Sequence, residues 1–140
     1  MIYPSLDEFR KIARPNAVVP VCKEILADLE TPVTAYLKIS RGQQYAFLLE
    51  SVEKAEVIGQ YSFLGANPSI VFRSKGRNGA VIRNGVEECF ESDNPLRELR
   101  ALMAQYEPVK VPGLPAFHGG AVGYLSYDQV RFFEKLPDAN

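Results

Sequence analysis

The dipeptide Asn84-Gly85 constrains the fold more than any other feature of this sequence. It lies between two short runs, residues 80–83 and 86–90, that each contain apolar and β-branched side chains. Asn-Gly favours the two-residue type I′ turn, whose backbone twist matches the twist of two paired strands. The dipeptide therefore predicts an antiparallel hairpin in the middle of the chain.

Other strands are expected on both sides of this hairpin. Residues 45–49 form a nearly continuous apolar run, which is typical of a strand covered on both faces. Residues 61–64 and 69–73 are predicted to be strands separated by a turn. Residues 18–22 form a short extended run, which we expect at a sheet edge because Pro20 has no backbone N–H to donate.

Helices are expected before and after the strands. Ser5 and Glu8 have the spacing of a capping box, in which each side chain accepts a hydrogen bond from the other residue's backbone N–H. A threonine or asparagine followed by proline marks two further helix starts. The expected helices follow Ser5, Thr31 and Asn94, with weaker helical tendencies over residues 23–29 and from Asp128. This order of elements predicts an α+β fold, with a mainly antiparallel β-sheet and flanking helices.

Three glycines, Gly119, Gly120 and Gly123, fall within an expected strand over residues 117–127. Glycine weakens a strand, so this spacing indicates a bulge or the close approach of another backbone. The approaching group could be a ligand or a helix packed tightly on the sheet. Tight packing is the favoured interpretation.

The composition indicates a globular protein in a reducing compartment. The 140 residues are enough for one domain with a core, and a net charge of −1 gives no electrostatic surface for nucleic acid or an anionic membrane. No apolar run approaches the roughly 20 residues that span a bilayer, and no secretory signal is visible. Two distant cysteines, Cys22 and Cys89, are expected to be buried thiols. These observations predict a cytoplasmic protein.

Residues for catalysis are scarce. The chain has one histidine, His118, which is expected to make a structural hydrogen bond, and it has no glycine-rich phosphate-binding motif. Neither catalytic residues nor a metal site can therefore be assigned. A binding or regulatory module fits this composition best.

Polar residues follow one expected strand and begin the next. Glu50 and Ser51 end the first strand, and Gln60, Tyr61, Ser62 and Phe63 open the second. An amino-acid ligand requires such a mixture, with an acceptor for its ammonium group, donors for its carboxylate and an apolar surface for its side chain. A solvated strand end is the alternative, and spacing alone favours it.

Three separated motifs resemble the N-terminal region of anthranilate synthase component I, of the chorismate-utilising enzyme family. They are residues 48–53, residues 58–68 and residues 119–134, and similarity extends over essentially the whole chain. The resemblance implies that residues 1–140 are an N-terminal regulatory domain. The catalytic, chorismate-binding domain would follow this chain.

The resemblance also implies an activity for the complete enzyme. Such enzymes are carbon–oxygen lyases that convert chorismate and ammonia into anthranilate and pyruvate with Mg²⁺, in tryptophan biosynthesis. A glutamine amidotransferase subunit, component II, supplies the ammonia. Since the residues that bind chorismate and Mg²⁺ would belong to the C-terminal domain, this chain alone is expected to be inactive.

The family's N-terminal region binds tryptophan as a feedback inhibitor, and the matching positions here imply the effector-binding residues. They are Ser51, Glu50, Gln60, Tyr61, Ser62 and Phe63. Many family members have arginine at the position of Gln60, so this amide would donate to the ligand carboxylate without a charge. Two alternatives remain open: aminodeoxychorismate synthase component I, and a stand-alone amino-acid-binding module.

Overall fold

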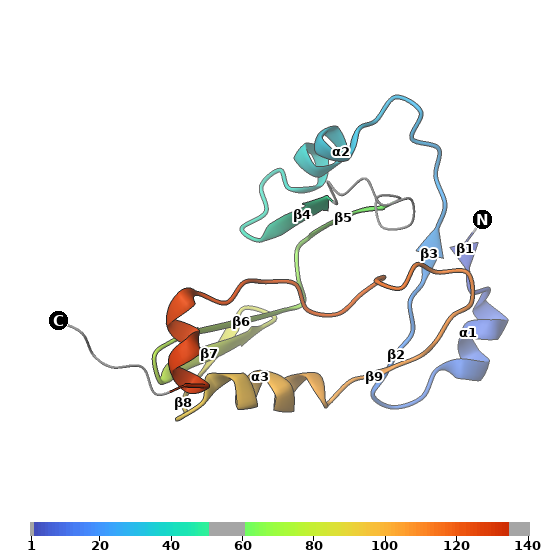
Figure 1. Ribbon diagram of the computed structural model, residues 1–140. Helices are drawn as coiled ribbons and strands as arrows, with labels where there is room; N and C mark the ends of the chain where they lie inside the picture. The colour runs from blue at the N-terminus through green and yellow to red at the C-terminus, as the bar shows by residue number, and fades with distance from the viewer. Residues whose placement is uncertain (1, 51–60, 135–140) are drawn as a thin grey trace. The chain divides into compact units, whose positions relative to one another are not determined.

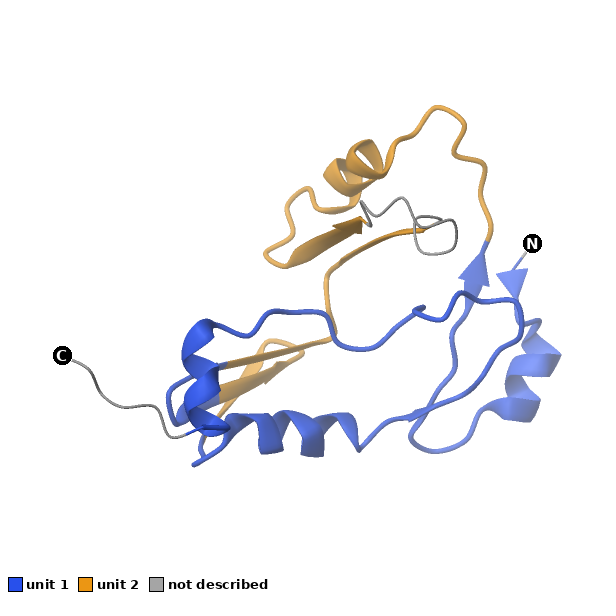
Figure 2. Ribbon diagram, in the orientation of Figure 1, with its two compact units in different colours: residues 1–23, 74–79, 91–140 blue, residues 24–73, 80–90 orange. Residues whose placement is uncertain are grey.

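The computed structural model describes residues 2–50 and 61–134 (Figure 1). The chain forms two compact units, each assembled from separate stretches of sequence (Figure 2). The first unit comprises Met1–Lys23, Ser74–Gly79 and Glu91–Asn140, and the second comprises Glu24–Arg73 and Ala80–Phe90.

The first unit contains short strands and three helical segments. Its elements are β1 (Ile2–Tyr3), α1 (Leu6–Ile12), β2 (Ala17–Val18), β3 (Cys22–Lys23), α3 (Pro95–Met103), β9 (Glu107–Pro108) and the 3₁₀ helix η1 (Tyr127–Phe132). The predicted capping box of α1 is confirmed, since Glu8 N–H donates to Ser5 Oγ at 3.3 Å and Ser5 N–H donates to the Glu8 carboxylate at 2.8 Å. Asn94 caps α3 by accepting from Leu96 N–H at 3.1 Å, also as expected.

The extended run over residues 18–22 divides between two sheets. Strand β3 pairs antiparallel with β1, whereas β2 pairs parallel with β9. The parallel pair continues beyond β9, because Val109 N–H donates to the Val18 carbonyl at 3.0 Å. Pro20 lies between β2 and β3, where its missing N–H interrupts no ladder. The run therefore divides between two strands, and each is an edge strand of a two-stranded sheet, as expected for the position of Pro20.

The second unit contains α2 and most of the strand residues. Three of its elements belong to it entirely: α2 (Pro32–Ile39), β4 (Ala46–Glu50) and β5 (Ser62–Ala66). It also contains most of β6 (Ile70–Lys75), β7 (Asn78–Arg83) and β8 (Val86–Glu91), whose remaining residues are assigned to the first unit. Thr31 caps α2 by accepting from Thr34 N–H at 3.1 Å, and α2 contacts both β4 and β5. The observed helices and antiparallel sheets confirm the predicted α+β class.

Strands β6, β7 and β8 form a three-stranded sheet in that order, visible in Figure 1. The predicted Asn84-Gly85 turn joins β7 to β8, and both residues have positive φ, 50° and 79°. Gly76, with φ of 58°, belongs to a second two-residue turn that joins β6 to β7. Phe72 and Phe90, on the two outer strands, stack with ring centroids 5.5 Å apart.

Two predicted elements are absent from the described part of the chain. Residues 24–29 form no helix, and residues 117–126 form no strand. The favoured explanation of the glycines also fails, because a Cβ added at Gly119 or Gly123 would meet no atom within 4 Å.

Burial is sparse among the described residues. The buried hydrophobic residues are Ala80, Leu102 and Val111. Strand β4 is not covered on both faces as expected, since Leu49 at its end is 47% exposed. Cys22 is half-buried and Cys89 is exposed, so the prediction of buried thiols was wrong for Cys89. None of the described helices is long and apolar enough to cross a membrane.

The Asn84-Gly85 turn gives a test of the hairpin. We expect Gly85→Ala to lower the free energy of unfolding by about 1 kcal/mol or more, because a side chain at positive φ is strained. Gly119→Ala is the matched control, since its φ is not positive and its added Cβ meets nothing. Urea unfolding followed by circular dichroism compares the two variants, and equal stability would contradict the assigned turn.

An ion pair beside the parallel strands predicts a pH dependence. Arg14 Nη2 and Nε donate to the two Glu107 carboxylate oxygens at 2.5 and 3.2 Å. These hydrogen bonds, and next the charge of Arg14, lower the pKa of Glu107 below its ordinary value of 4.5. A carboxylate whose pKa is lowered by folding stabilises the fold above its unfolded pKa, and this contribution disappears as the pH falls through the folded pKa.

Acidification below about pH 4.5 should therefore destabilise the protein less when Glu107 is replaced by Gln. Glu88→Gln is the control, because Glu88 is exposed and forms no ion pair with the described residues. The measurement is the urea midpoint between pH 7 and pH 3. If Glu107→Gln and Glu88→Gln changed this pH dependence equally, the Arg14–Glu107 pair would contribute nothing.

Candidate functional site

The candidate site lies at one end of the antiparallel ladder between β4 and β5. Five residue pairs face one another, from Ala46 opposite Ala66 to Glu50 opposite Ser62. Directly opposed side chains lie on the same face of a sheet, with Cβ atoms about 5 Å apart. The structure therefore brings the predicted residues Glu50 and Ser62 together at the last rung.

A close approach in the middle of this ladder favours the observed register. Phe47 lies opposite Gly65, and a Cβ built on Gly65 would be 2.5 Å from Phe47 Cε1 and 2.8 Å from Cζ. The phenyl ring therefore occupies the space that any other residue at position 65 would need. An isolated glycine in a strand is a sign of such an approach. Residues 65–68 were expected to form a turn, but Gly65 and Ala66 belong to β5.

Tyr61 and Phe63 lie on the other face of the β4–β5 pair. Phe63 is opposite Leu49, one rung before the Glu50–Ser62 pair, so alternation points its side chain away from Glu50 and Ser62. The Tyr61 ring stacks on Phe63 with a centroid separation of 6.1 Å and an interplanar angle of 26°. The described site residues therefore form two pairs on opposite faces of the sheet. The sequence pattern did not indicate this separation.

Ser51 and Gln60 lie outside the described residues, so their roles remain predictions. Glu50 and Ser62 are both exposed, and neither makes a hydrogen bond or ion pair with another described residue. An exposed carboxylate beside a hydroxyl can accept hydrogen bonds from an ammonium group. The last rung of the ladder thus supplies the hydrogen-bond acceptors that the ammonium group of an amino acid requires.

Neither His118 nor the acidic side chains of the described residues form a catalytic or metal-binding arrangement. His118 Nδ1 donates to the Pro115 carbonyl at 2.9 Å, which confirms the predicted structural hydrogen bond. Over residues 2–50 and 61–134, no three His, Cys, Asp or Glu side chains gather closely enough to hold a metal ion. The described residues therefore do not fit a Mg²⁺ site.

Comparison with known proteins finds a group of similar proteins that share one name. Curated proteins named anthranilate synthase component 1 match it from end to end: 39% identity over 140 residues in Acetivibrio thermocellus, 43% over 135 residues in Synechocystis sp. and 37% over 136 residues in Aquifex aeolicus. These matches cover 99%, 96% and 97% of this chain but only 28%, 26% and 28% of the respective relatives.

The chain thus spans about a quarter of the length of these relatives, and it matches their N-terminal quarter. No family model matches it. The similarity inferred from the motifs is confirmed: this chain is related to the N-terminal part of anthranilate synthase component 1.

The Phe47–Gly65 contact generates a test of the site's framework. We expect Gly65→Ala to destabilise the protein by about 1–3 kcal/mol, because the half-buried Phe47 ring must move out of the ladder. In a protein that already carries Phe47→Ala, Gly65→Ala should lower the free energy of unfolding much less, because the ring that it displaces is gone. A double-mutant cycle measured by urea unfolding gives the coupling, and additive effects would contradict the contact.

Proposed function

We propose that this chain is the N-terminal, tryptophan-sensing part of an anthranilate synthase component 1. The complete enzyme would convert chorismate and ammonia into anthranilate and pyruvate. A glutamine amidotransferase, component 2, would supply the ammonia, and the reaction would take place in the cytoplasm. The support is the common name of the relatives that match nearly the whole chain.

The effector site is proposed at the Glu50–Ser62 end of the β4–β5 ladder. A free amino acid carries a positive ammonium group, and the exposed Glu50 carboxylate offers it a charge-assisted hydrogen bond. The Ser62 hydroxyl, directly opposite Glu50, supplies a second acceptor. This opposed pair, two residues from separate predicted strands, is the observation on which the assignment of a site rests.

The remaining contacts follow from the resemblance. Ser51 would bind the ligand next to Glu50, and Gln60 would donate to the carboxylate. Tyr61 and Phe63 form a stacked pair on the opposite face. We propose that these rings contact the indole where it extends past the end of the ladder.

Mg²⁺ remains an expectation for the complete enzyme. Since the described residues do not fit a site for it, its ligands would come from the part of the enzyme that corresponds to the other three-quarters of the relatives. The role proposed for this chain involves no step at the metal ion. Its residues bind an effector, and they bias the activity through a coupling that is typically about 1–3 kcal/mol.

Inhibition of the full-length enzyme by tryptophan tests the proposal. We expect Glu50→Gln to raise the half-inhibitory concentration of tryptophan about tenfold or more, because the ligand's ammonium group loses its negatively charged acceptor and keeps only a neutral one. Ser51→Phe should abolish inhibition by filling the proposed ligand space. Anthranilate fluorescence at fixed chorismate measures both effects.

Glu88→Gln is the matched control, since it removes an exposed carboxylate on β8, away from the β4–β5 ladder. An unchanged half-inhibitory concentration in Glu50→Gln and Ser51→Phe would show that the last rung is only a solvated strand end. Loss of the uninhibited rate in the same variants would indicate a folding defect, which thermal unfolding of each variant would reveal.

A further inference from the structure

A pocket of about 480 Å³ lies at the opposite end of the β4–β5 ladder from Glu50. Asn67 N–H donates to the Tyr45 carbonyl at 3.2 Å and so adds one rung beyond the Ala46–Ala66 pair. Five residue steps separate Tyr45 from Glu50, which corresponds to roughly 17 Å along a strand. The volume is within the range of small-molecule sites. This pocket is therefore distinct from the proposed effector site.

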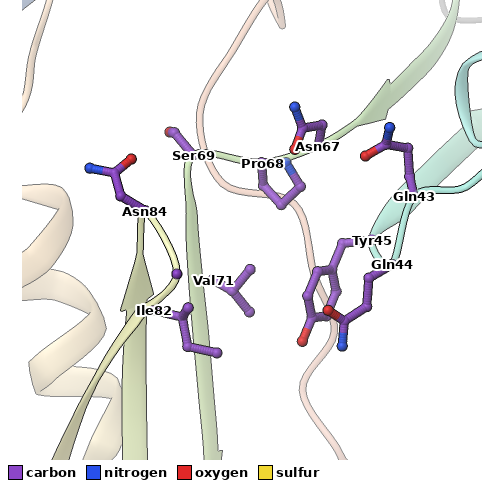
Figure 3. Close-up of a pocket in the computed structure, with 10 residues that line it drawn as sticks. Gln43, Gln44, Tyr45, Asn67, Pro68, Ser69, Val71, Ile82 and Asn84 are labelled. Atoms are coloured by element: carbon purple, nitrogen blue, oxygen red, sulfur yellow. The ribbon is translucent and has the colours of Figure 1, made fainter.

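The pocket has one aromatic wall and one aliphatic wall. In Figure 3 the Tyr45 ring faces Val71 and Ile82 across an open gap, with Pro68 at one edge. Val71 and Ile82 belong to the neighbouring strands β6 and β7, so the sheet fixes the aliphatic wall. Tyr45 is 37% exposed, which leaves part of its ring available to a ligand. A gap between two such surfaces suits a flat ring.

Side-chain carboxamides supply most of the polar groups around the gap. They belong to Gln43, Gln44, Asn67 and Asn84, and none of these four amides is hydrogen-bonded to another described residue. Asn67 and Asn84 have positive φ, 53° and 50°; Asn67 directly follows β5, and Asn84 lies in the turn between β7 and β8. Each carboxamide offers both a donor and an acceptor. That pairing matches the adjacent donor and acceptor on the edge of a purine base.

The pocket lining carries no formal charge. Arg73, two residues along β6 from Val71, is already paired with Glu87 at 2.6 Å. A zwitterionic amino acid would find no charged partner in the lining, so its two charges would be desolvated without compensation. An uncharged ligand does not incur this cost. We propose that this pocket binds a neutral planar heterocycle of the purine class. The ring stacks on Tyr45 against Val71 and Ile82, and its polar edge pairs with Gln44.

Titration of adenosine into the full-length protein tests this proposal. Isothermal calorimetry should detect saturable binding of adenosine. Tyr45→Leu should weaken it about tenfold or more, because base–aromatic stacking is lost, and Gln44→Leu should weaken it severalfold. Tyr106→Leu is the matched control, since Tyr106 is 38% exposed and lies in the other unit. It should bind adenosine with unchanged affinity.

Absence of saturable adenosine binding would overturn the proposal, as would equal affinities in the wild type, Tyr45→Leu and Gln44→Leu. Gln44→Leu changes an exposed side chain, so it remains informative if Tyr45→Leu unfolds. Adding tryptophan during the titration separates the two sites. Displacement of adenosine by tryptophan in competition would contradict a distinct neutral pocket, whereas failure of tryptophan to bind at all would affect only the proposed effector site.

Discussion

The contact between Phe47 and Gly65 is the constraint on which both ends of the β4–β5 ladder depend. A shift of one residue would place the phenyl ring opposite Leu64 or Ala66, whose Cβ atoms would occupy its space. The same shift would move every side chain of the strand to the other face. The steric fit at this rung therefore favours the register in which Glu50 lies opposite Ser62 and the Tyr45 carbonyl accepts from Asn67 N–H.

Elements whose determinants are local in sequence could be predicted. The caps at Ser5, Thr31 and Asn94 each bind a backbone N–H two or three residues away, so their geometry is encoded in a few neighbouring residues. The Asn84-Gly85 turn is equally local, because its two residues themselves adopt the required positive φ. In the candidate site, the sequence placed Glu50 and Ser62 at strand ends, and the ladder brings these ends together.

Elements that depend on distant partners could not be predicted in this way. Strand β2 pairs with β9 about 90 positions later, and no residue near Ala17 indicates a parallel partner. Residues 117–126 have the apolar and glycine content of a strand, but no described segment supplies a ladder for them. The placement of Tyr61 and Phe63 on the face opposite Glu50 follows from register, which the chain's composition does not show.

The two ends of the ladder differ in electrostatic character, and the two different ligands proposed for them follow from this difference. Glu50 presents a charge at one end, whereas the other end presents carboxamides and a phenol without a formal charge. Among the described residues of the two ends, Glu50 offers an ammonium group a counter-ion, while the carboxamides at the Tyr45 end offer a neutral heterocycle paired donors and acceptors. Because the Phe47–Gly65 contact opposes a slip between the strands, a coupling between the two ends would have to act without a change of register.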